Sequence, residues 1–193
     1  MRTALNVIRD EHRSLAAVLH GLQYLVNEVR KGKRKPDFTV LRAMVHYIDA
    51  FPEKLHHPKE DRYLFARLRQ RSTEANSMLD QLEAEHIHGA KLIRDLEQDL
   101  LRWEMGGEEN FTAFAEKVKQ YSDFHWRHMR QEEEVALPLA ERALTNEDWR
   151  EIDAAFAGNL DPLSGKDIGK DFERLFKRIV NIAPPPIGLG AES

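Results

Sequence analysis

The chain has 193 residues, a formal net charge of -4 and no cysteine. This length is enough to bury a core without disulfide support. The absence of cysteine excludes disulfides, iron–sulfur clusters, cysteine-ligated zinc and thiol catalysis, so any metal chemistry must use nitrogen and oxygen ligands. With its negative net charge, the chain lacks the excess of basic residues expected of a nucleic-acid-binding protein. The short basic run at 30–36 is interpreted as a solvated loop.

The N-terminal stretch "MRTALNVIRDEH" reaches acidic residues by position 10 and lacks the apolar segment of a secretion signal. No stretch approaches the roughly 20 apolar residues that a membrane span needs. We therefore expect a cytoplasmic protein with neither a membrane nor a nucleic acid as partner.

Apolar residues recur at helical spacing in four long runs, separated by short polar segments. The first run ends at a Gly/Lys/Arg loop before Pro36, and the third ends at Gly106 and Gly107, a strong helix terminator. The pattern predicts helices over residues 5–29, 37–72, 78–105 and 109–144.

Four long helices joined by short connections favour antiparallel neighbours. We expect an all-α fold in which residues 1–144 form an up-down-up-down four-helix bundle. Residues 145–193 are expected to form a helical appendage with two short helices, "NEDWREIDAAFAG" after Thr145 and "KDFERLFKRIVNI". The final "APPPIGLGAES" is rich in proline and glycine and predicts a loose tail.

The sequence contains an internal repeat that aligns polar residues. "DEHRSLAAVL" at 10–19 resembles "AEHIHGAKLI" at 84–93, which aligns His12 with His86, 74 positions apart. "HHPKEDRYLFARL" at 56–68 resembles "HMRQEEEVALPLA" at 128–140, which aligns His56 with His128, 72 positions apart, and Glu60 with Glu132. The similar offsets indicate two copies of one helical hairpin, related by a pseudo-twofold axis.

The repeated residues are the candidate metal ligands. His56 and Glu60 are four residues apart, a rise of about 6 Å and a rotation of about 40° on a helix, so both side chains reach the same point. His128 and Glu132 do the same, and His12 and His86 each add an imidazole. Buried groups of this kind must pair with one another or bind a cation. Imidazole and carboxylate donors suit two iron ions, with zinc or manganese as the other options.

These residues resemble the hemerythrin-like (HHE cation-binding) family over roughly residues 5–144. The resemblance rests on the Glu-His pairs at 11–12 and 85–86, on "HHPKED" followed by "LF", and on "HMRQEEEVALP". It implies an antiparallel four-helix bundle with a non-haem, oxo- or hydroxo-bridged di-iron centre. It also implies that this centre binds dioxygen or responds to oxygen, peroxide or nitric oxide.

The sequence departs from the oxygen-carrying hemerythrins at two positions. Those proteins have a second histidine four residues along the third helix, where this chain has Ala90, and an Asp at five residues on the fourth helix, where this chain has Glu132 at four. His125, one turn before His128, is a candidate replacement ligand. His57 aligns with Met129 and is expected to face away from the site. The surface or the bundle boundary is expected for three further histidines, His20, His46 and His88.

Several functions remain open from the sequence. The first is a di-iron protein whose iron pair binds or senses a small ligand such as oxygen, nitric oxide or peroxide. The second is a di-iron oxidoreductase with peroxidase- or oxidase-type activity. A ferritin-like site is disfavoured because its Glu-x-x-His spacing does not recur at the corresponding positions of the other hairpin. A metal-free scaffold is disfavoured because such a bundle would fill its axis with aliphatic residues. A homodimer is compatible with all of them.

Overall fold

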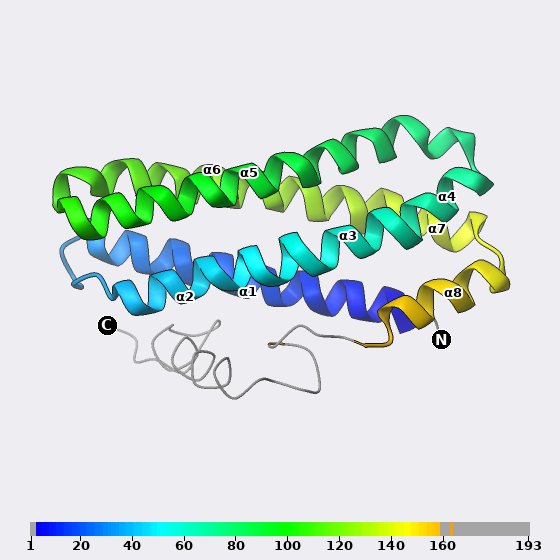
Figure 1. Cartoon of the computed structure of the whole chain (residues 1–193), viewed down its shortest axis with the longest axis horizontal. Coiled ribbons are helices and arrows are strands. Elements are labelled where there is room, and N and C mark those ends of the chain that lie inside the picture. The colour runs from blue at the N-terminus through cyan, green and yellow to red at the C-terminus, as the bar shows by residue number, and fades with distance from the viewer. Residues whose placement is uncertain (1–2, 159–162, 164–193) are drawn as a thin grey trace.

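The computed structural model describes residues 3–158 and 163, and its main feature is a set of four long antiparallel helical rods (Figure 1). Helix A is α1 (Thr3–Arg30) and helix C is α5 (Asn76–Gly106). Helix B runs without a break through α2 (Phe38–Ile48), η1 (Asp49–His56), α3 (His57–Lys59), η2 (Glu60–Phe65) and α4 (Ala66–Arg71). Helix D runs through α6 (Phe111–Gln131), η5 (Glu132–Ala136) and α7 (Leu137–Ala143).

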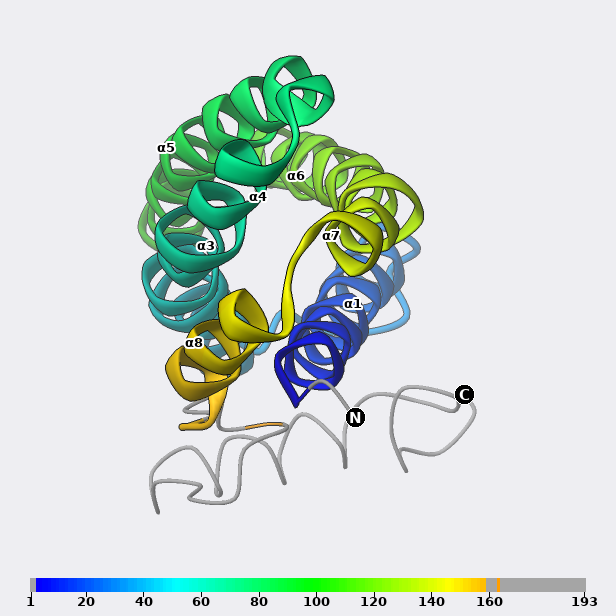
Figure 2. The same cartoon turned by 90° about the vertical axis from the view of Figure 1, so that its right-hand side faces the viewer.

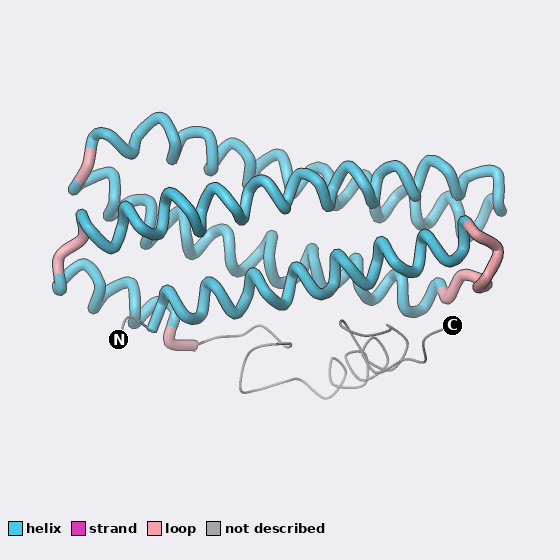
Figure 3. Tube along the Cα trace, turned by 180° about the vertical axis from the view of Figure 1, so that it is seen from behind, coloured by secondary structure: helices cyan, strands magenta, loops and turns pink. Residues whose placement is uncertain are grey.

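The rods surround a common axis, as the view along the bundle shows (Figure 2). Successive rods run in opposite directions, and the connections between them lie at the two ends of the bundle (Figure 3). The short helical turns η3 (Thr73–Ala75) and η4 (Glu108–Asn110) precede helices C and D. The predicted all-α, up-down-up-down bundle is confirmed.

The ends of the helices follow local sequence signals. Gly32 after helix A and Gly107 after helix C have φ values of 69° and 93°, which glycine adopts without steric cost. Asp37 caps helix B, because its carboxylate accepts a hydrogen bond from the Val40 amide at 3.1 Å. These signals place the turns where the apolar pattern is interrupted.

The apolar core is divided into two clusters along the bundle axis. One contains Leu15 and Leu19 of helix A and Leu92 and Leu96 of helix C. The other contains residues nearer the start of each of these helices, including Leu5, Ile8, Leu79 and Leu82. The segments between the clusters, around residues 11–12 and 85–86, carry the Glu-His pairs. A polar layer therefore separates two apolar halves of the core.

A further helix, α8 (Asn146–Phe156), packs beside helices A and B at one end of the bundle (Figures 1 and 2). Thr145 and Asp148 form a capping box that starts it. Trp149, Ile152 and Phe156 are buried in the second apolar cluster. The second predicted short helix, 170–182, and the proline- and glycine-rich tail lie outside the described residues.

Helices B and D both contain widened π-helical turns next to the repeated glutamates. One such turn, η2, begins at Glu60, and another, η5, begins at Glu132. Helix B has an additional one, η1, which contains Pro52. Since helix D has a widened turn without a proline at the position of Pro58, the repeated turn follows the glutamates rather than the proline.

None of the helices in the described part of the chain combines the length and the apolar character needed to cross a membrane.

Candidate metal centre

The polar layer contains six of the seven predicted ligands, and all six are buried. One histidine comes from each of helices A and C, and one His-Glu pair comes from each of helices B and D. The set consists of His12, His56, Glu60, His86, His128 and Glu132. Its two halves occupy corresponding positions of the two hairpins, as the repeat requires.

The first half of the centre joins helices A and B. The Nε2 atoms of His12 and His56 lie 3.1 Å apart. His56 Nε2 is 3.2 Å from Glu60 Oε2, and His12 Nε2 is 3.2 Å from Glu132 Oε2. Donor atoms from all four residues lie within 4.8 Å of one another, which is close enough to surround one metal ion.

The second half joins helices C and D in the same way. The Nε2 atoms of His86 and His128 also lie 3.1 Å apart. Glu132 Oε1 is 3.3 Å from His128 Nε2 and 3.5 Å from His86 Nε2. Glu60 Oε2 lies 3.7 Å from His86 Nε2. Both glutamates thus stand between the two histidine pairs, as bridging carboxylates would.

Each of the four histidines is held by a carboxylate at its other ring nitrogen. The carboxylates lie at 2.6 to 2.9 Å from Nδ1, in the pairs Glu11–His56, Asp61–His86, Glu85–His128 and Glu133–His12. In every pair the carboxylate belongs to the preceding helix, and helix D closes the ring onto helix A. An ionised carboxylate accepts a hydrogen bond from Nδ1–H, and this pairing leaves the Nε2 atom of each ring to face the centre, where it can bind a metal.

The arrangement fits a cation because the carboxylate oxygens at its centre have no hydrogen-bond donors beside them. All four carboxylate oxygens of Glu60 and Glu132 are buried and make no hydrogen bond in the described structure. The two Nε2 atoms of each half also lie 3.1 Å apart. Buried acceptors left in this state are costly, and metal ions satisfy them directly.

The pKa values of the two glutamates are displaced in opposite directions. Burial and the neighbouring Glu132 carboxylate raise the pKa of Glu60 well above its usual value. Burial acts in the same sense on Glu132, but His128, His12 and His86 outweigh it and hold the pKa of Glu132 well below its usual value. Without a cation, the site therefore favours only one ionised carboxylate of the two.

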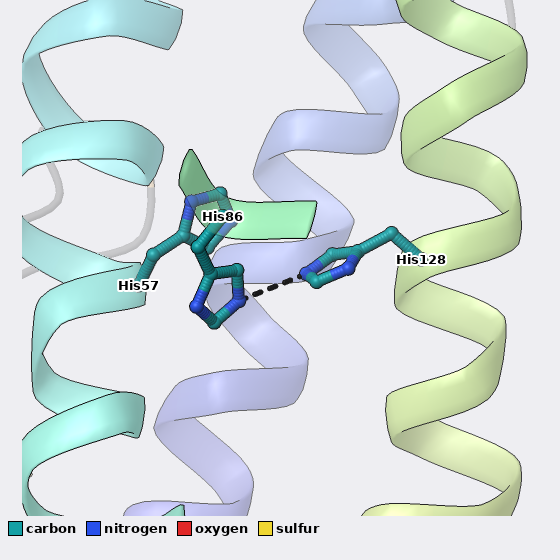
Figure 4. A group of neighbouring side chains, drawn as sticks. All are labelled: His57, His86 and His128. Carbon is teal, nitrogen blue, oxygen red and sulfur yellow. Dashed lines mark hydrogen bonds between the residues drawn. The ribbon is translucent and has the colours of Figure 1, made fainter. Parts of the chain in front are cut away.

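His57 corrects one expectation from the sequence. It was expected to face away from the site, yet it is buried and points toward the second histidine pair (Figure 4). Its ring lies parallel to that of His86, with centroids 4.2 Å apart. Donor nitrogens of His57, His86 and His128 lie within 4.8 Å of one another, so His57 could supply a third imidazole there.

The physical reason for the difference lies in helix B. The turn that ends at His56 is widened, and the His57 amide donates to the Pro52 carbonyl, five residues back. A regular helix places neighbouring residues about 100° apart, which would turn one of two adjacent histidines away. The widened turn changes this rotation, so both His56 and His57 are buried.

His125 belongs to neither of the two groups of candidate metal-binding side chains. It is fully buried, and its Nε2 lies 3.2 Å from Glu53 Oε1 instead. His20, His46 and His88 are exposed, in agreement with the expected surface positions. The carboxylates around the histidines were not predicted, although Glu11 and Glu85 themselves belong to the repeated Glu-His pairs.

A small cavity borders the first half of the centre. It is lined by Glu11, His12, Leu15, Tyr47, Phe51, Pro52, Leu55, His56 and Lys59. Its volume is ≈ 10 Å³, room for about one water-sized molecule. Most of its wall is apolar, and its polar groups belong to Glu11, His12, Tyr47, His56 and Lys59.

The fold and the site together define a class: helical-bundle proteins with a histidine and carboxylate metal centre on the bundle axis. The sequence profile of the hemerythrin HHE cation binding domain matches residues 3–140. The chain belongs to this family. A search of curated proteins found no significant match.

Proposed function

We propose that this protein binds two iron ions in the polar layer of the bundle. His12 and His56 would hold one ion, and His86 and His128 the other. Glu60 and Glu132 would contact both ions, which gives the buried oxygens of these two carboxylates a partner. The observation that carries the proposal is this pair of buried carboxylates, which have no donors and stand between two pairs of imidazole nitrogens.

The donor set supports iron among the available metals. Four imidazoles and two carboxylates without a thiolate suit iron, manganese or zinc, and paired ions sharing carboxylates in a helical bundle favour iron. The outer carboxylates contribute by orienting each ring and by making its inner nitrogen a better donor. Their loss would weaken the site even though they touch no metal.

We further propose that the iron pair binds or senses a small ligand: oxygen, nitric oxide or peroxide. A bound iron pair supplies an exchangeable coordination position and reversible redox change. The cavity beside His12 and His56 supports a small ligand, because its volume holds about one water-sized molecule. Its apolar side chains, among them Leu15 and Phe51, exclude larger polar compounds.

Metal analysis and visible spectroscopy test this function together. The metal-free chain is loaded with ferrous iron under anaerobic conditions, its iron content is measured, and oxygen, nitric oxide and peroxide are then added to separate samples. We expect close to two iron ions per chain and a reversible spectral change with at least one gas. A chain that retains no iron after this treatment would contradict the proposal.

An oxidoreductase with peroxidase- or oxidase-type activity is the second candidate. The observation that favours it is the presence of Glu11 and Lys59 in the wall of the cavity, where each could exchange a proton with a bound oxidant. In the same experiment, irreversible oxidation with continued peroxide consumption would favour this enzyme function. Reversible binding without turnover would favour the carrier or sensor.

A further inference from the structure

A second buried polar cluster, formed by Glu53, Tyr121 and His125, lies beside the metal centre and has no part in the function proposed above. Glu53 belongs to helix B, and the other two residues belong to helix D. The Tyr121 hydroxyl donates to Glu53 Oε1 at 2.6 Å, and His125 Nε2 lies 3.2 Å from the same oxygen. All three residues are buried, so the carboxylate is kept away from solvent.

Glu53 also holds His57. Its second oxygen, Oε2, accepts a hydrogen bond from His57 Nδ1 at 3.2 Å. The same relationship, a carboxylate on Nδ1, occurs at His12, His56, His86 and His128. His57 is therefore held by a carboxylate at Nδ1 as those four histidines are, which leaves its Nε2 available to bind a metal.

Helix C leaves space for this carboxylate at Gly89. A Cβ atom at that position would lie 3.0 Å from Glu53 Oε1 and 3.3 Å from Oε2, closer than ordinary contacts allow. Glycine in the middle of a helix is unfavourable by about 1 kcal/mol relative to alanine. Its presence in the interior of helix C is explained by the close approach of Glu53.

The repeat shows that only one half of the centre has this combination of Glu53, His57 and Gly89. The offsets that align the ligands also align His57 with Met129 and Gly89 with Leu15. Glu53 corresponds to His125, so the two equivalent positions contact each other instead of forming two clusters. The half that contains His12 and His56 has the small cavity, with Leu15 in its wall.

We propose that Glu53, fixed by Tyr121 and seated against Gly89, is a positioning residue that holds His57 toward His86 and His128 and makes the two metal positions unequal. The inference rests on the two-metal centre proposed above. The position with three oriented imidazoles binds its ion first and more tightly. The position beside the cavity binds its ion second.

The two positions should differ in metal affinity because they differ in the number of metal-binding side chains and in how firmly these are oriented. Glu60 and Glu132 serve both positions, whereas His57 adds a donor to only one of them. Removing a carboxylate that orients a metal-binding histidine lowers metal affinity about 10- to 100-fold. A change at Glu53 should therefore weaken one binding step and spare the other.

The test is an anaerobic titration of the full-length, metal-free chain with Co²⁺, in which a chromophoric chelator competes for the metal. Cobalt reports each step by its own absorption and does not turn over, so the readout is independent of activity. We expect two steps of unequal affinity in the wild-type chain. In Glu53→Gln the tighter step should weaken about 10- to 100-fold while the other step keeps its affinity.

Two further variants separate positioning from folding. Tyr121→Phe removes the hydroxyl that holds Glu53, and Gly89→Ala crowds the carboxylate without changing any charge; both should weaken the same tighter step. Ser122→Ala is the matched control for Tyr121, since the Ser122 hydroxyl is also buried on helix D but donates to the Val118 carbonyl of its own helix. Glu28→Gln is the control for Glu53, since Glu28 is a buried carboxylate that contacts Lys31 on its own helix. Circular dichroism confirms that each variant is folded.

Three outcomes would overturn the inference: equal steps in the wild-type chain, variants at Glu53 and Gly89 that change neither step, or variants that weaken both steps equally. In each of these outcomes the wild type still binds two ions, so the two-metal centre survives. Fewer than two cobalt ions bound by the wild-type chain would instead overturn the centre, and this inference with it.

Discussion

Glu60 and Glu132 come from different hairpins and meet on the bundle axis, where both are fully buried. Each glutamate stands four residues after a histidine and at the start of a widened turn of its helix. Neither carboxylate has a hydrogen-bond donor in the described structure. In a fold that otherwise fills its axis with aliphatic and aromatic side chains, this pair marks the place where a cation is needed.

Replacing Glu132 with alanine should abolish metal-dependent stabilisation. A metal that binds only the folded chain adds about 3 to 4 kcal/mol to the free energy of unfolding when it is present at 100 to 1,000 times its dissociation constant. Glu132 lies next to histidines of both halves, so its loss should affect both ions. Thermal melts of wild type and variant, with and without ferrous iron, measure the difference.

The control for this variant is His20→Ala, because His20 is exposed and lies away from the donors. This control should melt like the wild type and bind the same amount of iron. If Glu132→Ala kept the full metal-dependent increase in melting temperature, the bridging role of Glu132 would be wrong.

Replacing His57 with alanine should weaken metal binding, whereas replacing His88 should not. The two residues differ in position: His57 is buried against His86, and His88 is exposed on helix C. We expect an affinity loss of at least about tenfold for His57→Ala, measured by chelator competition. Equal affinities in the two variants would show that His57 only fills space.

The metal-free protein should become more stable toward acidic pH through Glu60. The pKa of Glu60 is raised above its usual value by burial and by Glu132. A group of this kind contributes stability that is fully present below its unfolded pKa, 4.5, and is lost as pH rises through its folded pKa. Glutamine cannot titrate, so metal-free Glu60→Gln should lose less stability than wild type above that pH.

Urea unfolding of both metal-free proteins at a series of pH values measures this difference. The gap between Glu60→Gln and wild type should widen as the pH increases from 4.5. A gap that stays constant over the series would mean that Glu60 titrates as it does in the unfolded chain.

Phe156→Ala should destabilise the whole bundle rather than release α8 alone. Phe156 is fully buried in the cluster that also contains Ile8 and Phe65 of the bundle. Truncating a buried phenylalanine costs about 3 to 5 kcal/mol. Urea unfolding followed by circular dichroism should show one transition at a lower midpoint. An unchanged midpoint would mean that α8 adds nothing to the stability of the bundle.

The fold could be predicted because the sequence of each rod contains a periodic apolar pattern and local signals for the ends of the helix. The apolar stripes, Gly107 and the cap at Asp37 are local features that tertiary contacts did not override. That the six candidate ligands lie together could be predicted for a different reason. They occur twice, and a repeated pair of polar residues is informative even when either copy alone is not.

The position of His57 could not be predicted because it depends on the backbone. The expectation assumed regular helical rotation between His56 and His57, and the widened turn that ends at His56 changed it. The ring of outer carboxylates depends on contacts between different helices, which the spacing within one helix does not report. A usable signal was present, since acidic residues adjoin candidate ligands in both copies, at Glu11 and Glu85 and at Asp61 and Glu133.

The two-iron centre is tested by the iron content of the chain after anaerobic loading with ferrous iron and removal of unbound metal. Wild type and Glu60→Ala are measured side by side, with His20→Ala as the control. We expect close to two iron ions per chain in wild type and control, and a clear loss in Glu60→Ala. Equal iron content in all three proteins, or none in wild type, would contradict this expectation.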